Sequence, residues 1–336
     1  MKIGVAGASG YAGAELLRLL AGHGAFEVVV ATGQRNEGNS LAEHTPSLGP
    51  AYPKVTYAPT TPESFEGCDL VFLALPHGAS QTLVPELMGT VPHLVDLGAD
   101  FRLTPELYAT WYGEAHQAPE LCGEAVYGLV ERHRAELAGA SLVAVPGCYP
   151  TATILGLGPF ADAGAIETTG LIIDAASGVS GAGRGVAERL QFSEVDEGFS
   201  AYGLLSHRHT AEMEQSLGAQ VLFTPHLAPM VRGMLVTAYA RPTMALTTAS
   251  AMDLLHAAYD HEAFVHVVDA PPTTKMASGS NSCFVTARVD ERTGWLVVLS
   301  AIDNLGKGAA GQALQCANLV LGLDEGTGLS QVGVYP

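Results

Sequence analysis

The chain begins with short apolar runs that alternate with segments of helical periodicity. Lys2 to Ala6 is the first apolar run, and Leu16, Leu17 and Leu20 then recur at helical spacing before Gly22. Similar runs follow at residues 26–31, 70–75, 94–96 and 142–145. Strands that are apolar throughout and alternate with helices are typical of a parallel sheet covered on both faces. This part of the chain is therefore predicted to form an α/β domain.

From about residue 165 the pattern changes to longer strand-like runs that lie closer together. These runs are residues 171–174, 221–223, 235–239, 283–289 and 296–302. Asp290 to Gly294 reads as a tight turn between the last two runs. We predict an antiparallel sheet, with a helix near residues 249–259 and the segment after Gly185 packed on one side. After Asp303, an Ala- and Leu-rich helix reaching about Leu321 returns to the first domain.

The length of 336 residues favours two domains. Residues 1–147 and 305–336 are assigned to the first domain, and residues 148–304 to the second. The uncharged run 137–161 is long enough to span a bilayer, but three prolines interrupt it, so it reads as a strand, a turn and a buried helix. The first residues lack the pattern of a signal peptide. No membrane segment is expected.

Composition excludes several classes of protein. Hydrophobic residues make up 48% and charged residues 15%, which excludes disorder. With 16 basic and 34 acidic residues the formal charge is −18, so nucleic acid and anionic membranes would be repelled. Five scattered cysteines without a CxxC motif suggest neither a disulfide framework nor a metal site. Reduced thiols in the cytoplasm fit this pattern best.

A glycine triplet directly follows the first predicted strand. Gly7, Gly10 and Gly13 in GASGYAG lie between that strand and a helix, where glycines let a pyrophosphate approach backbone N–H groups at the helix N-terminus. The spacing is GxxGxxG rather than GxGxxG, and an ordinary tight turn is the alternative. Its place in the first βαβ unit favours dinucleotide binding.

The end of the second strand bears on the choice of cofactor. A site that prefers NAD usually has an acidic residue there, which holds the ribose hydroxyls. Here the strand ends at Ala31 and continues Thr32-Gly33-Gln34-Arg35. A hydroxyl, an amide and a guanidinium therefore stand where a 2′-phosphate would lie, which favours NADP. A solvated role for Arg35 is the alternative.

Cys148 is the most informative side chain of the sequence. In VAVPGCYPTA a strand ends, Pro146-Gly147 turns the chain, and a helix begins near Pro150 or Thr151. A thiol at a helix N-terminus is a better nucleophile, because the positive end of the helix dipole favours the thiolate. The other four cysteines lie in apolar or mixed runs and are adequately explained as core residues.

A thiolate nucleophile needs a partner that moves protons. Of twelve histidines, His207 and His209 in SHRHTAE occupy an unusual polar loop. Alternate residues of an extended stretch face opposite ways, so only one of them should meet the thiol, and a structural role for either stays open.

Two further clusters suit anion binding. Arg102 ends the segment DLGADFR and could hold phosphate or carboxylate through a forked pair of hydrogen bonds. The loop SGVSGAGR at 177–184 could cradle an anion with its backbone N–H groups. A plain surface turn is the alternative for each.

Taken together, these motifs resemble the N-acetyl-gamma-glutamyl-phosphate reductases of arginine biosynthesis, which are related to the aspartate-semialdehyde dehydrogenases. The resemblance spans essentially the whole chain, and PGCYPT and HRHTAE carry it most specifically. One departure is Ala211, which replaces a proline but removes no chemical group.

The resemblance implies a Rossmann domain completed by the C-terminal helix, and an α+β domain of the glyceraldehyde-phosphate-dehydrogenase type that also makes the oligomer contact. It implies Cys148 as nucleophile and His207 or His209 as acid–base, with His207 slightly favoured. The residues implied to bind NADP are Gly7, Ser9, Gly10, Tyr11, Gly13, Arg35, Pro76, His77, Ser177, Gly178, Asn304 and Gly306. Those implied to bind substrate are Arg102, Ser180, Glu212 and Arg232.

The implied reaction is NADPH-dependent reduction of N-acetyl-L-glutamyl 5-phosphate to the semialdehyde and phosphate, through a thioester on Cys148, by a homodimer or homotetramer. A lysine-pathway aminoadipyl-phosphate reductase or an aspartate-semialdehyde dehydrogenase would share this chemistry. A thiol hydrolase and a non-catalytic NADP sensor are the alternatives from other classes. A hydrolase would not need the glycine triplet, and a sensor would not need a cysteine at a helix start with a histidine in a loop.

Overall fold

The computed structural model describes residues 1–334, and the chain divides into two compact units. The first unit comprises residues 1–146 and 309–329, and the second begins at Gly147, runs to Gly308 and resumes at Ser330. The sequence assigned all of 305–336 to the first domain, but the last described residues lie in the second unit. There Ser330 O accepts a hydrogen bond of 2.8 Å from Asn281 N. This backbone hydrogen bond joins Ser330 to the second unit, so the first unit ends at residue 329.

A six-stranded parallel sheet in the order β2-β1-β3-β4-β6-β5 forms the centre of the first unit. Its strands are β1 (Lys2–Ala6), β2 (Glu27–Ala31), β3 (Leu70–Leu73), β4 (His93–Asp96), β5 (Val126–Tyr127) and β6 (Leu142–Ala144). All five predicted runs form strands. Because β1 lies between β2 and β3, the winding of the sheet reverses there, and such a reversal is where ligands bind at the carboxyl ends of strands.

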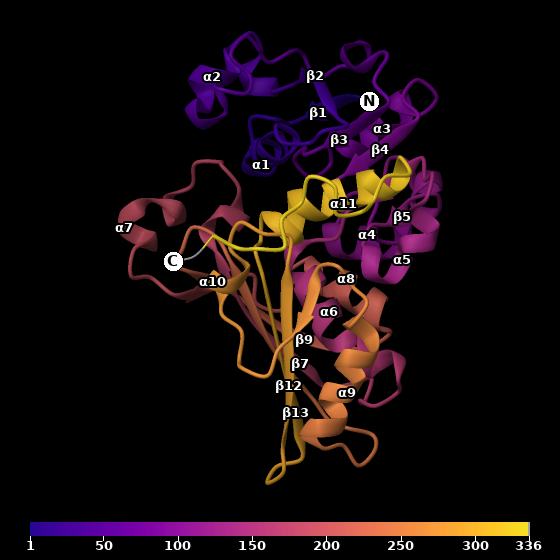
Figure 1. Cartoon of the computed structure of the whole chain (residues 1–336), viewed down its shortest axis with the longest axis vertical. Coiled ribbons are helices and arrows are strands. Elements are labelled where there is room, and N and C mark those ends of the chain that lie inside the picture. Colours follow the sequence, from indigo (N-terminus) through magenta and orange to yellow (C-terminus); the bar gives the residue numbers. More distant parts are fainter. Residues whose placement is uncertain (335–336) are drawn as a thin grey trace. The chain divides into compact units, whose positions relative to one another are not determined.

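Helices cover both faces of this sheet (Figure 1). They are α1 (Tyr11–Leu20), α2 (Leu41–His44), α3 (Ser80–Leu87), α4 (Pro105–Tyr112), α5 (Val130–Leu137) and α11 (Gly311–Val320). Leu16 of α1 and Leu314 of α11 belong to the core on one face, and Val84 of α3 belongs to the core on the other. The C-terminal helix α11 contacts α1 and α5 within this unit.

A seven-stranded sheet in the order β11-β12-β13-β10-β7-β9-β8 forms the second unit. Its strands are β7 (Leu171–Gly178), β8 (Ser200–Ala201), β9 (Val221–Ala228), β10 (Met234–Ala240), β11 (Val265–Val267), β12 (Cys283–Asp290) and β13 (Trp295–Ile302). The antiparallel prediction holds for four of the six neighbouring pairs, but β7–β9 and β11–β12 are parallel, so the sheet is mixed. The long connection from β7 to β9 permits this parallel pairing.

The helices α6, α8 and α9 lie on one face of this sheet (Figure 1). The helices of the second unit are α6 (Cys148–Asp162), α7 (Phe192–Val195), α8 (His209–Leu217), α9 (Thr248–Tyr259) and α10 (Thr274–Ala277). A Cβ at Gly156 of α6 would lie 3.3 Å from Val298, which shows how closely α6 approaches β13. In the described residues, no helix is both long and apolar enough to cross a membrane.

The segment after Gly185 differs from its prediction. Rather than packing on the sheet, it exposes large apolar side chains: Val186 is 100% exposed, Phe192 80% and Leu205 78%. The only regular structure between β7 and α8 in this part is short, namely α7, β8 and brief 3₁₀ turns. These elements are too short to bury the apolar side chains against their own unit.

Candidate active site

The glycine triplet forms a tight turn that brings backbone very close to backbone. Gly7 has φ +74°, and a Cβ there would lie 2.2 Å from Ala74 O. A Cβ at Gly13 would lie 2.4 Å from Gly7 O. Gly10 precedes the first residue of α1, where the helix N–H groups begin. The turn therefore has the backbone geometry that fits a pyrophosphate at a helix N-terminus.

The end of β2 lies beside this turn. Ala8 N donates to Thr32 O at 2.8 Å, and a Cβ at Gly33 would lie 3.1 Å from Ser9 Oγ. Arg35 is exposed in a 3₁₀ turn at Gln34–Asn36. Ser9 and the backbone around Gly33 thus lie together, and Arg35 extends from the same loop.

Arg102 lies in the loop after β4 and is only 9% exposed. Its Nη2 donates to Leu97 O at 2.8 Å. Asp96 is fully buried nearby and accepts hydrogen bonds from Ser80 Oγ and Gly98 N. Burial raises the pKa of Asp96 to about 7, and the charge of Arg102 acts in the opposite direction. The loop therefore fixes Arg102 through its backbone, close to a buried acid.

Cys148 is the first residue of α6, two or three residues earlier than the helix start predicted near Pro150 or Thr151. The Gly147 N–H donates to Glu212 Oε1 at 2.8 Å, and Thr151 Oγ1 donates to Gly147 O at 2.9 Å. A Cβ at Gly308 would lie 2.8 Å from Cys148 Cβ. Cys148 is therefore held at the positive end of a helix by contacts on both sides, where a thiolate is favoured.

The two histidines of the predicted pair differ in environment. His207 Nδ1 accepts a hydrogen bond of 3.2 Å from His209 N, and the His207 ring meets Tyr149, Tyr202 and Phe223 edge to face. His209 begins α8, and its ring centroid lies 5.9 Å from that of Tyr149. One ring nitrogen of His207 therefore already serves to fix the turn into α8.

Burial lowers the pKa of His207 to about 4, and the charge of Arg208 adds to the shift. Since the folded-state value lies below the ordinary 6.5, the unfolded chain takes up this proton first as the pH falls. The stability linked to neutral His207 is present above pH 6.5 and is lost as the pH falls toward 4. We expect His207→Gln to flatten the dependence of unfolding free energy on pH in this window, measured by urea denaturation.

The matched control is His256→Gln, because His256 is exposed and pairs with Asp260 on the surface of α9. An unchanged pH slope in His207→Gln would mean that another group causes the loss.

The predicted residues of the 177–184 loop and of the segment after β13 are joined in one network. Asn304 Nδ2 donates to Ser180 Oγ at 2.9 Å, and Gly233 N donates to Asn304 Oδ1 at 2.8 Å. Arg232 Nε lies 2.9 Å from Asp303 Oδ2, and Asp303 is fully buried. Ser177 is buried beside Gly178, and a Cβ at Gly306 would lie 2.3 Å from Ser280 O. These loops are therefore rigidly interlinked.

Two groups were missed by sequence reasoning. Tyr149, next to Cys148, donates to His226 O at 3.2 Å and accepts from Tyr202 Oη at 3.1 Å, and it packs against both histidines. Asp100 accepts hydrogen bonds from the loop that contains His77. For Asp100 the available signal was an acidic residue four positions after the end of an apolar strand, a feature shared by many surface loops.

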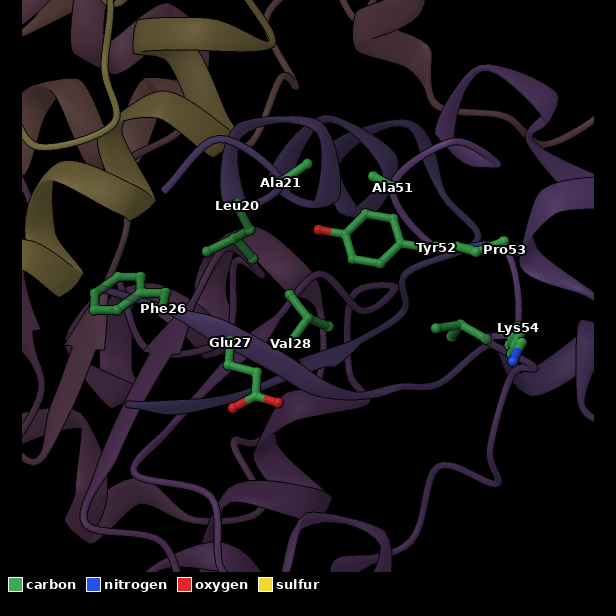
Figure 2. Close-up of a pocket in the computed structure, with 10 residues that line it drawn as sticks. Leu20, Ala21, Phe26, Glu27, Val28, Ala51, Tyr52, Pro53 and Lys54 are labelled. Atoms are coloured by element: carbon green, nitrogen blue, oxygen red, sulfur yellow. The ribbon is translucent and has the colours of Figure 1, made fainter. Parts of the chain in front are cut away.

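A pocket of about 430 Å³ lies elsewhere in the first unit, at the start of β2 (Figure 2). Leu20, Phe26 and Tyr52 line it together with Lys54. None of the predicted site residues lines this pocket.

Comparison with known families covers both parts of the chain. Residues 2–140 match the family described as "Semialdehyde dehydrogenase, NAD binding domain", and residues 148–304 match "Semialdehyde dehydrogenase, dimerisation domain". An N-acetyl-gamma-glutamyl-phosphate reductase of Symbiobacterium thermophilum is 49% identical over 100% of this chain and 99% of its own length. That of Desulforamulus reducens is 46% identical over 100% of both chains.

Solved structures share the fold at low sequence identity. Aspartate semialdehyde dehydrogenase II from Vibrio cholerae, complexed with ASA, has a TM-score of 0.71 at 16% identity, covering 95% of this chain and 98% of that one. The aspartate semialdehyde dehydrogenase with NADP from Candida albicans has a TM-score of 0.68 at 17% identity, covering 95% and 98%. With the full-length relatives and the two family matches, these similarities show that this chain belongs to the semialdehyde dehydrogenases, in the N-acetyl-gamma-glutamyl-phosphate reductase family.

Proposed function

We propose that this chain catalyses the NADPH-dependent reduction of N-acetyl-L-glutamyl 5-phosphate to N-acetyl-L-glutamate 5-semialdehyde and phosphate, a step of arginine biosynthesis. The observation that carries the proposal is Cys148 at the first position of α6, in a chain of this family. The substrate follows from the names of full-length relatives at 44–49% identity.

Cys148 acts as the nucleophile in this proposal. Its thiolate attacks the acyl carbon, the bond to phosphate breaks, and a thioester forms. NADPH, when bound, would supply the hydride that reduces this thioester. The acid–base histidine donates a proton to the carbonyl oxygen as the hemithioacetal forms and takes it back as the carbon–sulfur bond breaks, which releases the aldehyde and returns the thiolate. Glu212, which the resemblance implied to bind substrate, also accepts a hydrogen bond from the Gly147 N–H, which supports a role in orienting the helix start that carries the thiol.

We assign the acid–base role to His209 rather than to the slightly favoured His207. His207 is neutral at pH 7 because burial lowers its pKa to about 4, and its Nδ1 already accepts from the His209 backbone. A group with so low a pKa holds a proton poorly at neutral pH and gives little general acid catalysis. His209 begins the same helix that carries Glu212, one turn apart.

The first unit fits a nicotinamide dinucleotide, because Gly7 and Gly13 let the turn pack against neighbouring backbone that a Cβ would strike, and a Cβ at Gly10, before α1, would meet only Gly7 O at 3.5 Å. We propose NADP rather than NAD, since β2 ends without an acid and Arg35 extends from the following turn. Gly10 and Tyr11 at the start of α1, and Ser9 beside Gly33, complete the proposed cofactor contacts.

Arg35→Ala tests the cofactor choice. We expect it to weaken NADPH binding by about 1.5–3 kcal/mol, the scale of a hydrogen bond to a charged group, and to leave NADH binding nearly unchanged. Fluorescence titration of both cofactors measures this. Lys54→Ala is the control, since Lys54 is an exposed cation that lines the separate pocket with Tyr52 and lies outside the proposed cofactor contacts (Figure 2). Equal losses for both cofactors would mean that Arg35 only holds the loop together.

Arg102, Arg232 and Ser180 are proposed to bind the acyl phosphate. The chain carries a charge of −18, so an anionic substrate depends on such local groups. Asp303 fixes the Nε side of Arg232, which presets the direction of its guanidinium. A forked guanidinium suits carboxylate and phosphate alike.

We also propose a homodimer or homotetramer. The face of the second sheet opposite α6 carries Ile172, Tyr239 and Val297 side by side, and each stays partly exposed. Phe192 and Leu205 of the same unit are 80% and 78% exposed, and exposed large apolar side chains of this kind favour an interaction surface. The second family match is a dimerisation domain, which supports a second copy as its occupant. Mass measurement by light scattering tests this, and a monomer at micromolar concentration would contradict it.

The reaction itself is tested in reverse. Purified protein is incubated with NADP, phosphate and N-acetylglutamate semialdehyde, aspartate semialdehyde or N-acetylated aminoadipate semialdehyde, and reduced nicotinamide is followed by absorbance. We expect NADP to be reduced only when phosphate is present, and faster with N-acetylglutamate semialdehyde than with the other two semialdehydes. Preference for another semialdehyde would overturn the proposed substrate, and turnover without phosphate would overturn the acyl-phosphate chemistry. A reducing compartment such as the cytoplasm suits this reaction, because Cys148 must remain a thiol.

A further inference from the structure

Asp100 is a fully buried carboxylate in the loop after β4, and every hydrogen bond described for its side chain comes from the loop after β3 or the start of α3. We propose that Asp100 is a positioning residue for the dinucleotide. It holds residues 76–78 in the conformation that borders the bound cofactor. This inference rests on the proposed function, since it takes the cofactor to lie at this edge of the sheet.

Three donors converge on the Asp100 carboxylate. His77 Nδ1 lies 3.0 Å and Gly78 N lies 2.9 Å from Oδ1, and Gln81 N lies 3.1 Å from Oδ2. Gly78 has φ +85°, and Gln81 is in the first turn of α3. One carboxylate therefore fixes the His77 side chain, a turn with a left-handed glycine and the start of α3.

Aromatic rings hold the His77 side chain from its other side. The His77 ring lies 4.3 Å from that of Tyr112, which stacks on Tyr108 at 4.5 Å with an interplanar angle of 7°. Gln81 Nε2 donates to the Tyr108 hydroxyl at 3.2 Å, and Gln117 N donates to Gln81 Oε1. The rings position the His77 side chain, whereas the backbone N–H groups of Gly78 and Gln81 donate their described hydrogen bonds to Asp100, so the backbone of this loop depends on Asp100.

The loop matters because of where β3 lies. β3 neighbours β1 at the reversal of the sheet, and the backbone at Ala74 runs against the glycine turn, with Ala74 O 2.2 Å from a Cβ built on Gly7. Residues that follow Ala74 therefore border the crevice in which a dinucleotide binds. A displaced 76–78 loop would intrude on the cofactor or lose contact with it, without touching the chemistry at Cys148.

The test compares Asp100→Asn and Asp100→Ala with Asp69→Asn. Asp69 accepts the Lys2 N–H at 2.7 Å at the opposite, amino end of the same sheet, so it is an exposed carboxylate that also accepts from backbone but lies outside the proposed loop. NADPH dissociation constants are measured by fluorescence, and KM is measured for NADPH and for acyl phosphate. Hydrogen exchange is followed at the Gly78 and Gln81 amides.

We expect NADPH affinity to fall about tenfold in Asp100→Asn and about 100-fold in Asp100→Ala, on the scale of one or two hydrogen bonds to a charged group. KM for acyl phosphate should stay within about twofold, a split that general destabilisation would not produce. The Gly78 and Gln81 amides should exchange faster in Asp100→Asn, while Asp69→Asn matches the wild type. If Asp100→Ala fails to fold, the NADPH affinity and the two KM values of Asp100→Asn alone test the inference.

Wild-type NADPH affinity in Asp100→Asn, or equal rises in both KM values, would overturn the inference while leaving the reaction intact. Weakened NADPH binding in Asp100→Asn together with a wild-type enzyme that does not reduce acyl phosphates would support the inference and overturn the proposed reaction. A wild-type chain that binds no NADPH would overturn both.

Discussion

Cys148→Ser is expected to lower kcat by at least about a thousandfold, because an alcohol at neutral pH is a far weaker nucleophile than a thiolate at a helix start. NADPH affinity should stay within about twofold of the wild type, since the glycine turn at Gly7 to Gly13 is unchanged. Steady-state kinetics and fluorescence titration of NADPH measure the two quantities.

Cys122→Ser is the matched control. Cys122 is also partly exposed, but burial and nearby acids raise the pKa of its thiol to about 11, so it holds little thiolate at neutral pH. This variant should keep full activity. If Cys148→Ser retained more than a few per cent of wild-type turnover, the covalent route would be wrong.

His209→Asn is expected to lower kcat by about 10²–10⁴-fold, the usual contribution of a general acid–base, and to flatten the pH dependence of kcat. His207→Asn should have a much milder effect on kcat, with lower stability, because His207 packs among Tyr149, Tyr202 and Phe223. pH–rate profiles of both variants make the comparison.

The reverse result, a collapse in His207→Asn with a normal profile in His209→Asn, would return the acid–base role to His207. Two normal profiles would place it on another histidine altogether.

Much of the fold could be predicted because each strand carries its own apolar run. β5 and β8 were missed because they span only two residues, and β11 was missed because His266 interrupts its three-residue run. β9 extends beyond its prediction to Ala228 through Pro225, a residue that usually argues against a strand. The parallel β7–β9 pair could not be predicted, since pairing between distant segments leaves no local signal.

The candidate site was predictable where chemistry depends on a local motif. The glycine turn and the strand, turn and helix around Cys148 both have local sequence signatures, and both are present. The choice between His207 and His209 depends on burial by side chains from β9 and from the loop before α8. The bonds of Asp100 depend on two loops meeting after separate strands. Neither arrangement is visible in the order of residues alone.

The thioester on Cys148 is the central claim, and intact-protein mass spectrometry tests it most directly. The protein is mixed with N-acetylglutamyl phosphate in the absence of NADPH, and the modified peptide is mapped. We predict one added N-acetylglutamyl group on Cys148, absent in Cys148→Ser and discharged when NADPH is added. Wild-type protein that turns over substrate yet shows no adduct on Cys148 under these conditions, or carries it on another residue, would contradict the claim.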